Sequence, residues 1–252
     1  AAIKTDDTLW TMGLNYKGGL GDGTTTDRWI PTLIGSGFAS VAVGDGYTAA
    51  IKTDGSLWAW GYNNYGELGD GTETDRLSPV WIGDDYASVA SGNNHTVAIR
   101  TDGTLWAWGY NSSGQVGDGT TTHRSSPVQI GTDFSWVAAG QSHTFALADD
   151  GVLWAWGSDT YGELGDGATT QQSSPIVIGA GYVSVSAGGS DTLAVMSDGT
   201  LWAWGYNIFG ELGDGTTINR GSPVLIGSDY VSVEAGGLHS FAFKTDGTLW
   251  AW

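Results

Sequence analysis

A 48-residue repeat is the feature that most constrains this chain. A Leu-Trp pair opens the same segment of every copy, and its tryptophan recurs every 48 residues, at Trp10, Trp58, Trp106, Trp154, Trp202 and Trp250. The five prolines keep the same spacing, at Pro31, Pro79, Pro127, Pro175 and Pro223. No insertion interrupts the period, so the sequence predicts one repeat array over residues 1–252, with each copy packed on its neighbours.

Each repeat is predicted to hold four short strands. In the copy after Gly83, the strands are expected at residues 86–90, 95–100, 105–110 and 127–130. An Asp-Gly pair between the second and third strands predicts a two-residue hairpin turn. Pro127 is expected to open the fourth strand, because a missing N–H costs little at the start of an edge strand. No segment has the 3.6-residue period of a helix. Four strands in a repeat of this length indicate an all-β fold, a β-propeller of four-stranded antiparallel blades.

The third strand of each repeat is apolar on both faces. Trp58 and Trp60 are expected on one face, and Leu57 and Ala59 on the other, since side chains alternate along a strand. Blades with one bulky and one small face can stack on copies of themselves. The sequence supplies four complete sets of strands and a partial blade at each end, so we expect about six visible blades.

Composition excludes some classes of function. The 27 acidic residues outweigh nine basic ones and give a net charge of −18, which repels phosphate backbones and excludes nucleic acid as an expected partner. The absence of cysteine excludes disulfides and thiolate metal sites. No apolar run of about 18 residues predicts a membrane-spanning helix, and no signal peptide is visible. Because both ends fall inside a repeat, we expect the chain to be part of a longer polypeptide.

A family pattern is visible in the second copy. It reads Trp60-Gly61-Tyr62-Asn63, Gly66-Glu67-Leu68-Gly69-Asp70-Gly71, Arg76, Pro79, Gly92-Asn93-Asn94-His95-Thr96 and Asp102-Gly103. This pattern resembles the regulator of chromosome condensation repeat, and the resemblance extends over essentially the whole chain. The first copy departs with Met12 and Leu14, and the fourth with Gln172 in place of arginine. The resemblance implies a propeller, typically seven-bladed. Whether further repeats exist or the ring closes with fewer blades stays open.

The copies differ from one another at two sets of positions, which are our candidate binding residues. One set precedes a recurring glycine and comprises Tyr16 and Lys17, Asn64 and Tyr65, Ser112 and Ser113, Thr160 and Tyr161, and Ile208 and Phe209. The other follows the Ala-Gly turn and comprises Tyr47, His95, His143, Asp191 and His239. Each set is expected to form a ring of loops on the propeller rim, where loops on a rigid scaffold bind partners. Tyr65, Tyr161 and Phe209 are the expected aromatic anchors. Drift at uncritical positions explains the variation equally well.

Nothing in the sequence indicates catalysis. The equivalent histidines are expected to lie too far apart to share one tetrahedral metal ion, which favours structural histidines. The Gly-Asp-Gly turns lack the nonapeptide calcium pattern. Residues outside the repeat pattern form no acid–base or nucleophile set; they are Lys17, Trp29, Trp81, Trp136 and Met196. The sequence therefore predicts neither a metal site nor a cofactor.

The leading hypothesis is a non-catalytic binding propeller that contacts a protein or a glycan through its rim loops. The resemblance to acidic, tryptophan-rich bacterial arrays of this family implies a secreted or cell-surface protein. An enzyme regulator or inhibitor is the alternative, because the family includes a nucleotide exchange factor and β-lactamase inhibitors. A light receptor ranks last, since the Gly-Trp-Arg-His-Thr motif is absent, and a purely architectural array stays open.

Overall fold

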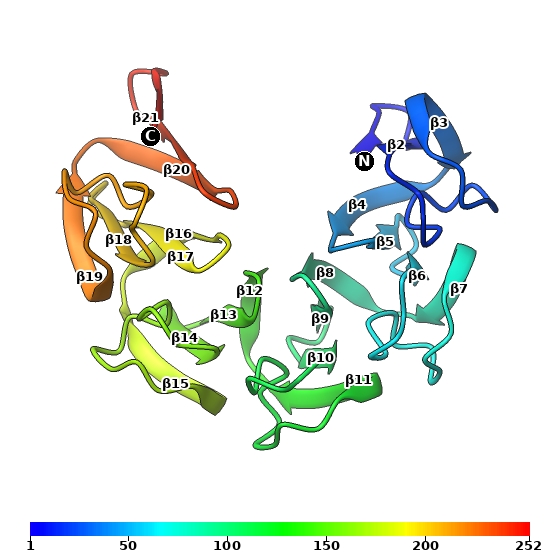
Figure 1. Ribbon diagram of the computed structural model, residues 1–252, viewed down its shortest axis with the longest axis horizontal. Helices are drawn as coiled ribbons and strands as arrows, with labels where there is room; N and C mark the ends of the chain where they lie inside the picture. Colours follow the sequence, from blue (N-terminus) through cyan, green and yellow to red (C-terminus); the bar gives the residue numbers. More distant parts are fainter. The chain divides into compact units, whose positions relative to one another are not determined.

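The computed structural model describes residues 1–252, which fold into 22 strands without a helix. The strands form six antiparallel sheets, of which the first and last have three strands and the others four (Figure 1). This confirms the predicted all-β fold of four-stranded blades with an incomplete blade at each end. Since the structure has no helix, it offers no candidate for a membrane-spanning helix.

The chain divides into two compact units. The first unit comprises Ala1–Ser112 and Thr122–Val137, and the second comprises Ser113–Thr121 and Ala138–Trp252. The sheets of the first unit consist of β1 (Ala2–Ile3), β2 (Leu9–Gly13) and β3 (Arg28–Gly35); β4 (Phe38–Val43), β5 (Tyr47–Lys52), β6 (Leu57–Gly61) and β7 (Arg76–Gly83); and β8 (Tyr86–Ser91), β9 (His95–Arg100), β10 (Leu105–Gly109) and β11 (Arg124–Gly131).

The division between the units falls within β12 (Phe134–Ala139). The remaining strands are β13 (His143–Ala148), β14 (Val152–Gly157) and β15 (Gln172–Ala180); β16 (Tyr182–Ala187), β17 (Asp191–Met196), β18 (Leu201–Gly205) and β19 (Arg220–Gly227); and β20 (Tyr230–Ala235), β21 (Ser240–Lys244) and β22 (Leu249–Ala251). Within every sheet the strands pair in the order of the chain.

The outermost strand begins earlier than the sequence suggests. The prediction placed its start at Pro127, but β11 begins at Arg124. Three residues, Ser125 to Pro127, lie opposite Trp108 alone, because β10 pairs Ala107 with Val128 and Gly109 with Arg124. The proline therefore lies in a bulge of an edge strand, where its missing N–H removes no ladder hydrogen bond.

The predicted hairpin between the second and third strands is also present, with a longer loop. The N–H of Gly103 donates to the Arg100 carbonyl at 3.0 Å, and the N–H of Arg100 donates to the Thr104 carbonyl at 2.9 Å. Gly103 has a φ of +77°. These bonds define a three-residue loop with glycine in the left-handed conformation, in place of the two-residue turn that Asp-Gly suggested.

Sheets of the first unit stack through the two faces of the third strand, as predicted. Trp60 is fully buried with Leu9 of the preceding sheet. On the opposite face, Leu57 and Ala59 are buried with Trp108 of the following sheet. A large side chain thus covers a small-residue face at each step, and neither face of an inner sheet stays wet.

A repeated hydrogen bond fastens each sheet to the loop of the sheet before it. The indole N–H of Trp108 donates to the Glu67 carbonyl at 2.9 Å. In the second unit the indole N–H groups of Trp156 and Trp204 donate to the Gln115 and Glu163 carbonyls, also at 2.9 Å. A Cβ on Gly69 would lie 2.7 Å from the Trp108 indole nitrogen. The loop glycine is therefore needed for this close approach.

Candidate protein-binding surface

The loop between β6 and β7 is held in one conformation by a buried side chain. The Asn63 carboxamide oxygen accepts the N–H of Leu68 at 3.0 Å. Its amide nitrogen donates to the carbonyls of Thr72 and Thr74, both at 3.1 Å. Asn63 is completely buried. The loop is therefore a rigid support, and it presents the exposed Asn64 and the half-buried Tyr65.

Two carboxylates complete this loop. The Asp70 carboxylate accepts the Arg76 guanidinium at 2.7 Å. Burial favours the neutral acid, but hydrogen bonds from Thr72 and Arg76 still hold the pKa of Asp70 below its usual value. Glu67 accepts the N–H of Tyr65 at 2.9 Å, yet burial raises the pKa of Glu67 to about 7. Glu67 therefore titrates near neutral pH at the base of the loop.

Four rings form what we call the first-unit aromatic cluster: Tyr62, Tyr65, Tyr110 and His123. The Tyr65 ring meets Tyr110 edge to face, with centroids 4.8 Å apart, and meets His123 at 5.2 Å. Tyr110 and His123 stack at 4.7 Å, and Tyr62 lies 6.2 Å from Tyr65. The His123 Nδ1 atom accepts the N–H of Asn111 at 2.9 Å, which orients the imidazole. All four rings are half-buried, so they are fixed by packing and also reach the surface.

Tyr16 and Lys17 extend this surface towards the first sheet. The Lys17 amine pairs with the Asp75 carboxylate at 3.2 Å and lies 5.1 Å from the centre of the Tyr62 ring. Tyr16 is 60% exposed. Lys17 thus links the first sheet to the aromatic cluster by a contact that combines charge and ring geometry.

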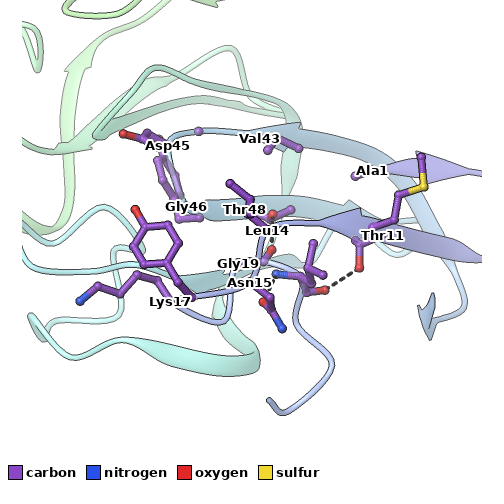
Figure 2. Close-up of a pocket in the computed structure, with 15 residues that line it drawn as sticks. Ala1, Thr11, Leu14, Asn15, Lys17, Gly19, Val43, Asp45, Gly46 and Thr48 are labelled. Atoms are coloured by element: carbon purple, nitrogen blue, oxygen red, sulfur yellow. Dashed lines mark hydrogen bonds between the residues drawn. The ribbon is translucent and has the colours of Figure 1, made fainter. Parts of the chain in front are cut away.

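A pocket of about 200 Å³ lies beside these two residues (Figure 2). Its walls come from β2 and the loop after it, and from the turn between β4 and β5. Apolar side chains such as Val43 and Leu14 line it together with Lys17 and Asp45. Tyr47 also lines it, which brings three of the sequence-predicted residues, Tyr16, Lys17 and Tyr47, to one place.

The second unit carries a smaller ring group. Tyr161 lies 4.9 Å from Tyr206, and Tyr206 lies 6.3 Å from Phe209. Phe209 is 68% exposed, and Ile208 beside it is also exposed. The remaining predicted loop residues, Ser112, Ser113 and Thr160, are exposed or half-buried and carry no aromatic ring. The first candidate set thus lies at the surface as predicted, and its binding role stays a prediction.

The second candidate set does not lie on a rim, with one exception. Tyr47, His95, His143 and Asp191 are the first residues of β5, β9, β13 and β17, and each side chain is buried. His239 alone is exposed. The prediction of an exposed ring was wrong here, because a residue directly after a Gly-rich turn is covered by the following sheet. Buried side chains cannot contact a partner in this conformation.

Burial determines the protonation of these residues. It lowers the pKa of His143 to about 4, an effect that the Glu163 carboxylate partly offsets, so this imidazole is neutral. Burial, with the Glu211 carboxylate nearby, raises the pKa of Asp191 to about 7. His143 and Asp191 are therefore internal polar groups of the second unit. No group of three or more histidine or acidic side chains is arranged to hold a metal ion.

The fourth repeat departs from the loop design. Asp159 stands at the position of Asn63, and it is fully buried. Its carboxylate accepts the N–H groups of Leu164 and Thr170 at 3.0 and 3.1 Å, but it cannot donate as the asparagine does. Burial raises the pKa of Asp159 to about 6. Gln172 replaces the arginine that pairs with Asp70 in the second repeat, so no cation compensates this loop.

Sequence reasoning missed most of the first-unit aromatic cluster. Tyr62 and Tyr110 belong to the repeated Gly-Tyr-Asn segment, whereas the candidate residues were chosen at positions that differ between the copies. His123 stands where the first two copies have Asp27 and Asp75. That exception to the repeat was a usable signal. The contact of Tyr65 with the next copy's tyrosine depends on how the blades stack, which one repeat does not reveal.

Comparisons with known proteins agree with this fold. The family model described as the RCC1-like domain matches residues 1–252. Human WBSCR16 shares 21% identity at a TM-score of 0.86, over 98% of this chain and 73% of that one. Yeast RCC1 (Prp20), solved bound to Kap60, shares 20% at a TM-score of 0.85, over 99% and 65%. Prp20p from Saccharomyces cerevisiae shares 21% at a TM-score of 0.84, over 99% and 67%. The search among curated proteins finds no significant match. The chain belongs to the RCC1-like domain family.

Proposed function

We propose that this chain is a non-catalytic protein-binding module, and that the first-unit aromatic cluster is the centre of its contact surface. The observation that carries the proposal is the packing of Tyr65 against Tyr110 and His123 on a rigid loop. Aromatic side chains that are already ordered lose little conformational entropy on binding and provide large contact area.

Charge supports a protein partner with a basic or neutral surface. The net charge of −18 repels anionic partners such as nucleic acid and favours encounter with basic ones. Of the two yeast Prp20 structures, one contains Kap60 bound to that protein, and the other concerns its binding to Gsp1p and histones. The shared fold supports the class of partner and leaves its identity to experiment.

A photo-crosslinking experiment tests the proposal. A photoreactive phenylalanine analogue is placed at Tyr65, and in a control protein at Ile30, an outer-strand side chain that is 74% exposed. We expect the first protein to crosslink to a protein partner and the control not to. With the purified partner, Tyr65→Ala and Tyr110→Ala are each expected to weaken binding about tenfold or more, the effect of losing an interface anchor.

Partner binding that is unchanged in both alanine variants would contradict the proposal. A glycan array that gives saturable binding, lost in the same variants, would replace the protein by a sugar ligand. The extracellular or cell-surface setting remains a proposal from the sequence, and it is tested by protease treatment of intact cells that express the full gene.

A further inference from the structure

The hairpin between the second and third strands carries the same polar network in most repeats. In the third repeat, the indole N–H of Trp106 donates to the Thr104 hydroxyl at 2.8 Å. That hydroxyl donates to the Asp102 carboxylate at 2.6 Å. The Arg100 guanidinium lies over the Trp106 ring, 4.5 Å from its centre. The edge and one face of this tryptophan are therefore both occupied by groups of the chain itself.

Other copies occupy the equivalent tryptophan in the same way. A lysine amine lies over the ring in the first, second and sixth copies, at 3.9, 4.5 and 5.1 Å, in the pairs Lys4–Trp10, Lys52–Trp58 and Lys244–Trp250. In these copies the indole N–H also donates to a serine or threonine hydroxyl. The fifth copy has Met196 in place of the cation, but Trp202 still donates to the Thr200 hydroxyl.

The fourth repeat lacks both partners of this tryptophan. Ala148 stands where the other copies have a cation, and Val152 stands where they have the hydroxyl. Trp154 therefore has neither a cation over its ring nor an acceptor for its indole N–H. The side chain is half-buried, and its indole nitrogen reaches solvent. A π face and a hydrogen-bond donor are thus left for an external group.

Two carboxylates on the same hairpin also lack a cation. Asp149 replaces a residue that is threonine or serine in the other copies, and Asp150 follows it. Both are exposed, and neither forms an ion pair. The Asp150 carboxylate accepts the N–H of Val152 at 3.0 Å, but it has lost the hydroxyl donor that Asp102 keeps. The hairpin between β13 and β14 (Figure 1) therefore combines an unoccupied indole with two uncompensated negative charges.

We propose that this hairpin binds a lysine or arginine side chain of a partner protein, which lies over the Trp154 ring and pairs with the Asp149 and Asp150 carboxylates. The ring face attracts a cation, and the carboxylates strengthen that attraction. The indole N–H then donates to a main-chain carbonyl of the partner. Val177 lies opposite Trp154 on β15 and is 56% exposed, so it contacts the methylene groups of the bound side chain.

The charges favour a basic side chain over a glycan. An exposed indole also suits a sugar ring, but four other copies of this chain place lysine or arginine on the equivalent ring. The net charge of −18 further favours the approach of a cation. The inference goes beyond the proposed function, because it assigns a contact in the second unit and specifies the residue type that the partner contributes.

An arginine peptide tests the inference directly. The probe is acetyl-Gly-Arg-Gly-amide, titrated into the intact chain with isotope-labelled tryptophan and followed by nuclear magnetic resonance. The Trp154 indole signal is the one that disappears in Trp154→Phe. We expect this signal to shift saturably. The same peptide with citrulline, which keeps the shape and loses the charge, should bind at least about tenfold more weakly. Added salt should weaken the arginine peptide.

Matched protein variants separate this hairpin from other surfaces. Ala148→Lys restores the residue that lies over the ring in the second repeat, so it should occupy Trp154 and weaken peptide binding at least about tenfold. Ile218→Lys adds the same charge to a loop side chain that is 62% exposed, and it should bind as the unchanged chain does. Thermal melts of both variants check that folding is intact. Asp149→Thr, which restores the common residue, should weaken binding about threefold.

Three results would overturn the inference: no saturable shift of the Trp154 signal, binding that survives Ala148→Lys in the folded variant, or equal binding of the arginine and citrulline peptides. If Ala148→Lys does not fold, binding that is unchanged in Asp149→Thr overturns it instead. A shift of the Trp154 signal by cellobiose, without one by the arginine peptide, would assign the site to a glycan.

The outcomes also separate this inference from the proposed function. Partner crosslinking at Tyr65 without binding of the arginine peptide removes only this inference. Peptide binding that is lost in Ala148→Lys, together with partner binding that is unchanged in Tyr65→Ala and Tyr110→Ala, removes only the proposed contact surface of the first unit.

Discussion

The two tryptophans of the repeated Trp-Ala-Trp segment occupy different environments, although both recur in nearly every copy. Trp108 is fully buried and donates to the Glu67 carbonyl. Trp106, two residues earlier, is half-buried and donates to the Thr104 hydroxyl at 2.8 Å. The first tryptophan fastens one sheet to another, whereas the second closes a local turn. The two tryptophans are therefore expected to contribute unequally to stability, although both recur from copy to copy.

Trp108→Phe should reduce the free energy of unfolding by about 1 kcal/mol, because the buried Glu67 carbonyl loses one of its two donors and keeps only the Thr96 hydroxyl. Trp106→Phe should change it by less than about 0.5 kcal/mol, as expected near the surface. Guanidinium denaturation monitored by circular dichroism measures both. Equal losses in the two variants would show that the indole hydrogen bond does not distinguish these positions.

Asp191 gives stability a pH dependence. Its folded-state pKa is about 7, above the ordinary value of 3.8. Between these values the folded state keeps a proton that the unfolded state has lost, so this contribution to stability is full below pH 3.8 and is lost as pH rises through about 7. Asp191→Asn should therefore lose less stability between pH 5 and pH 8 than the unchanged chain. Urea denaturation at both pH values measures this, with the exposed Asp149→Asn as control.

The environment of a residue was predictable where it depends on the alternation of side chains along its own strand. It was not predictable where it depends on contacts with the neighbouring sheet. The two faces of the Trp-Ala-Trp strand could be assigned because strand side chains alternate. Tyr47 and His143 were predicted on the rim but are buried, since a polar residue after a turn resembles a surface residue in the sequence. Their burial comes from the following sheet, which contributes the carbonyls and threonines that surround them.

At the scale of the elements, the loops between third and fourth strands keep the same fold although their stabilising residues differ between repeats. In the second repeat, Asn63 donates to two carbonyls, and Asp70 and Arg76 form an ion pair. In the fourth, Asp159 only accepts, and Gln172 bonds its own loop at 3.2 Å. We expect this fourth loop to open most readily, because its buried carboxyl has a raised pKa and no cation beside it.

Limited proteolysis should therefore cut first between residues 158 and 172. Asp159→Asn should slow that cleavage and raise the free energy of unfolding at pH 8 by about 1 kcal/mol, since the amide can make the bonds that Asn63 makes. Glu234→Gln, an exposed change in the same unit, serves as control. Faster cleavage in the asparagine variant would show that the loop has adapted to its carboxylate.

The strand boundaries were predictable from the sequence where the residues of a turn alone determine its conformation. The Asp102-Gly103 pair marked its hairpin correctly, while the loop is one residue longer because Gly103 forms a bulge. Pro127 marked the outermost strand but not its start. The bulge opposite Trp108 that accommodates the proline depends on pairing with β10, which the proline itself does not encode.

In the molecule as a whole, we expect a destabilising substitution to affect only its own sheet and the sheets next to it, because each repeat contacts only its neighbours. Trp204 is fully buried, donates to the Glu163 carbonyl and packs on Phe145 and Tyr182. Trp204→Ala should cost about 3–5 kcal/mol. Hydrogen exchange measured by mass spectrometry should then rise in β16–β19, while β4–β11 of the first unit keeps its protection. Uniformly faster exchange would indicate that the entire chain unfolds as one unit.

The prolines of the outer strands have a consequence beyond local pairing. An array of nearly identical copies offers each newly made strand many wrong partners, in its own chain and in others, and such chains are prone to aggregate. In the complete sheets the outer strand is the edge on which a foreign strand would add. Pro79 in β7, Pro127 in β11 and their equivalents remove an N–H donor there and lie in bulges that interrupt the regular edge. One proline in each outer strand thus protects that edge against pairing with a foreign strand and helps to keep the array soluble.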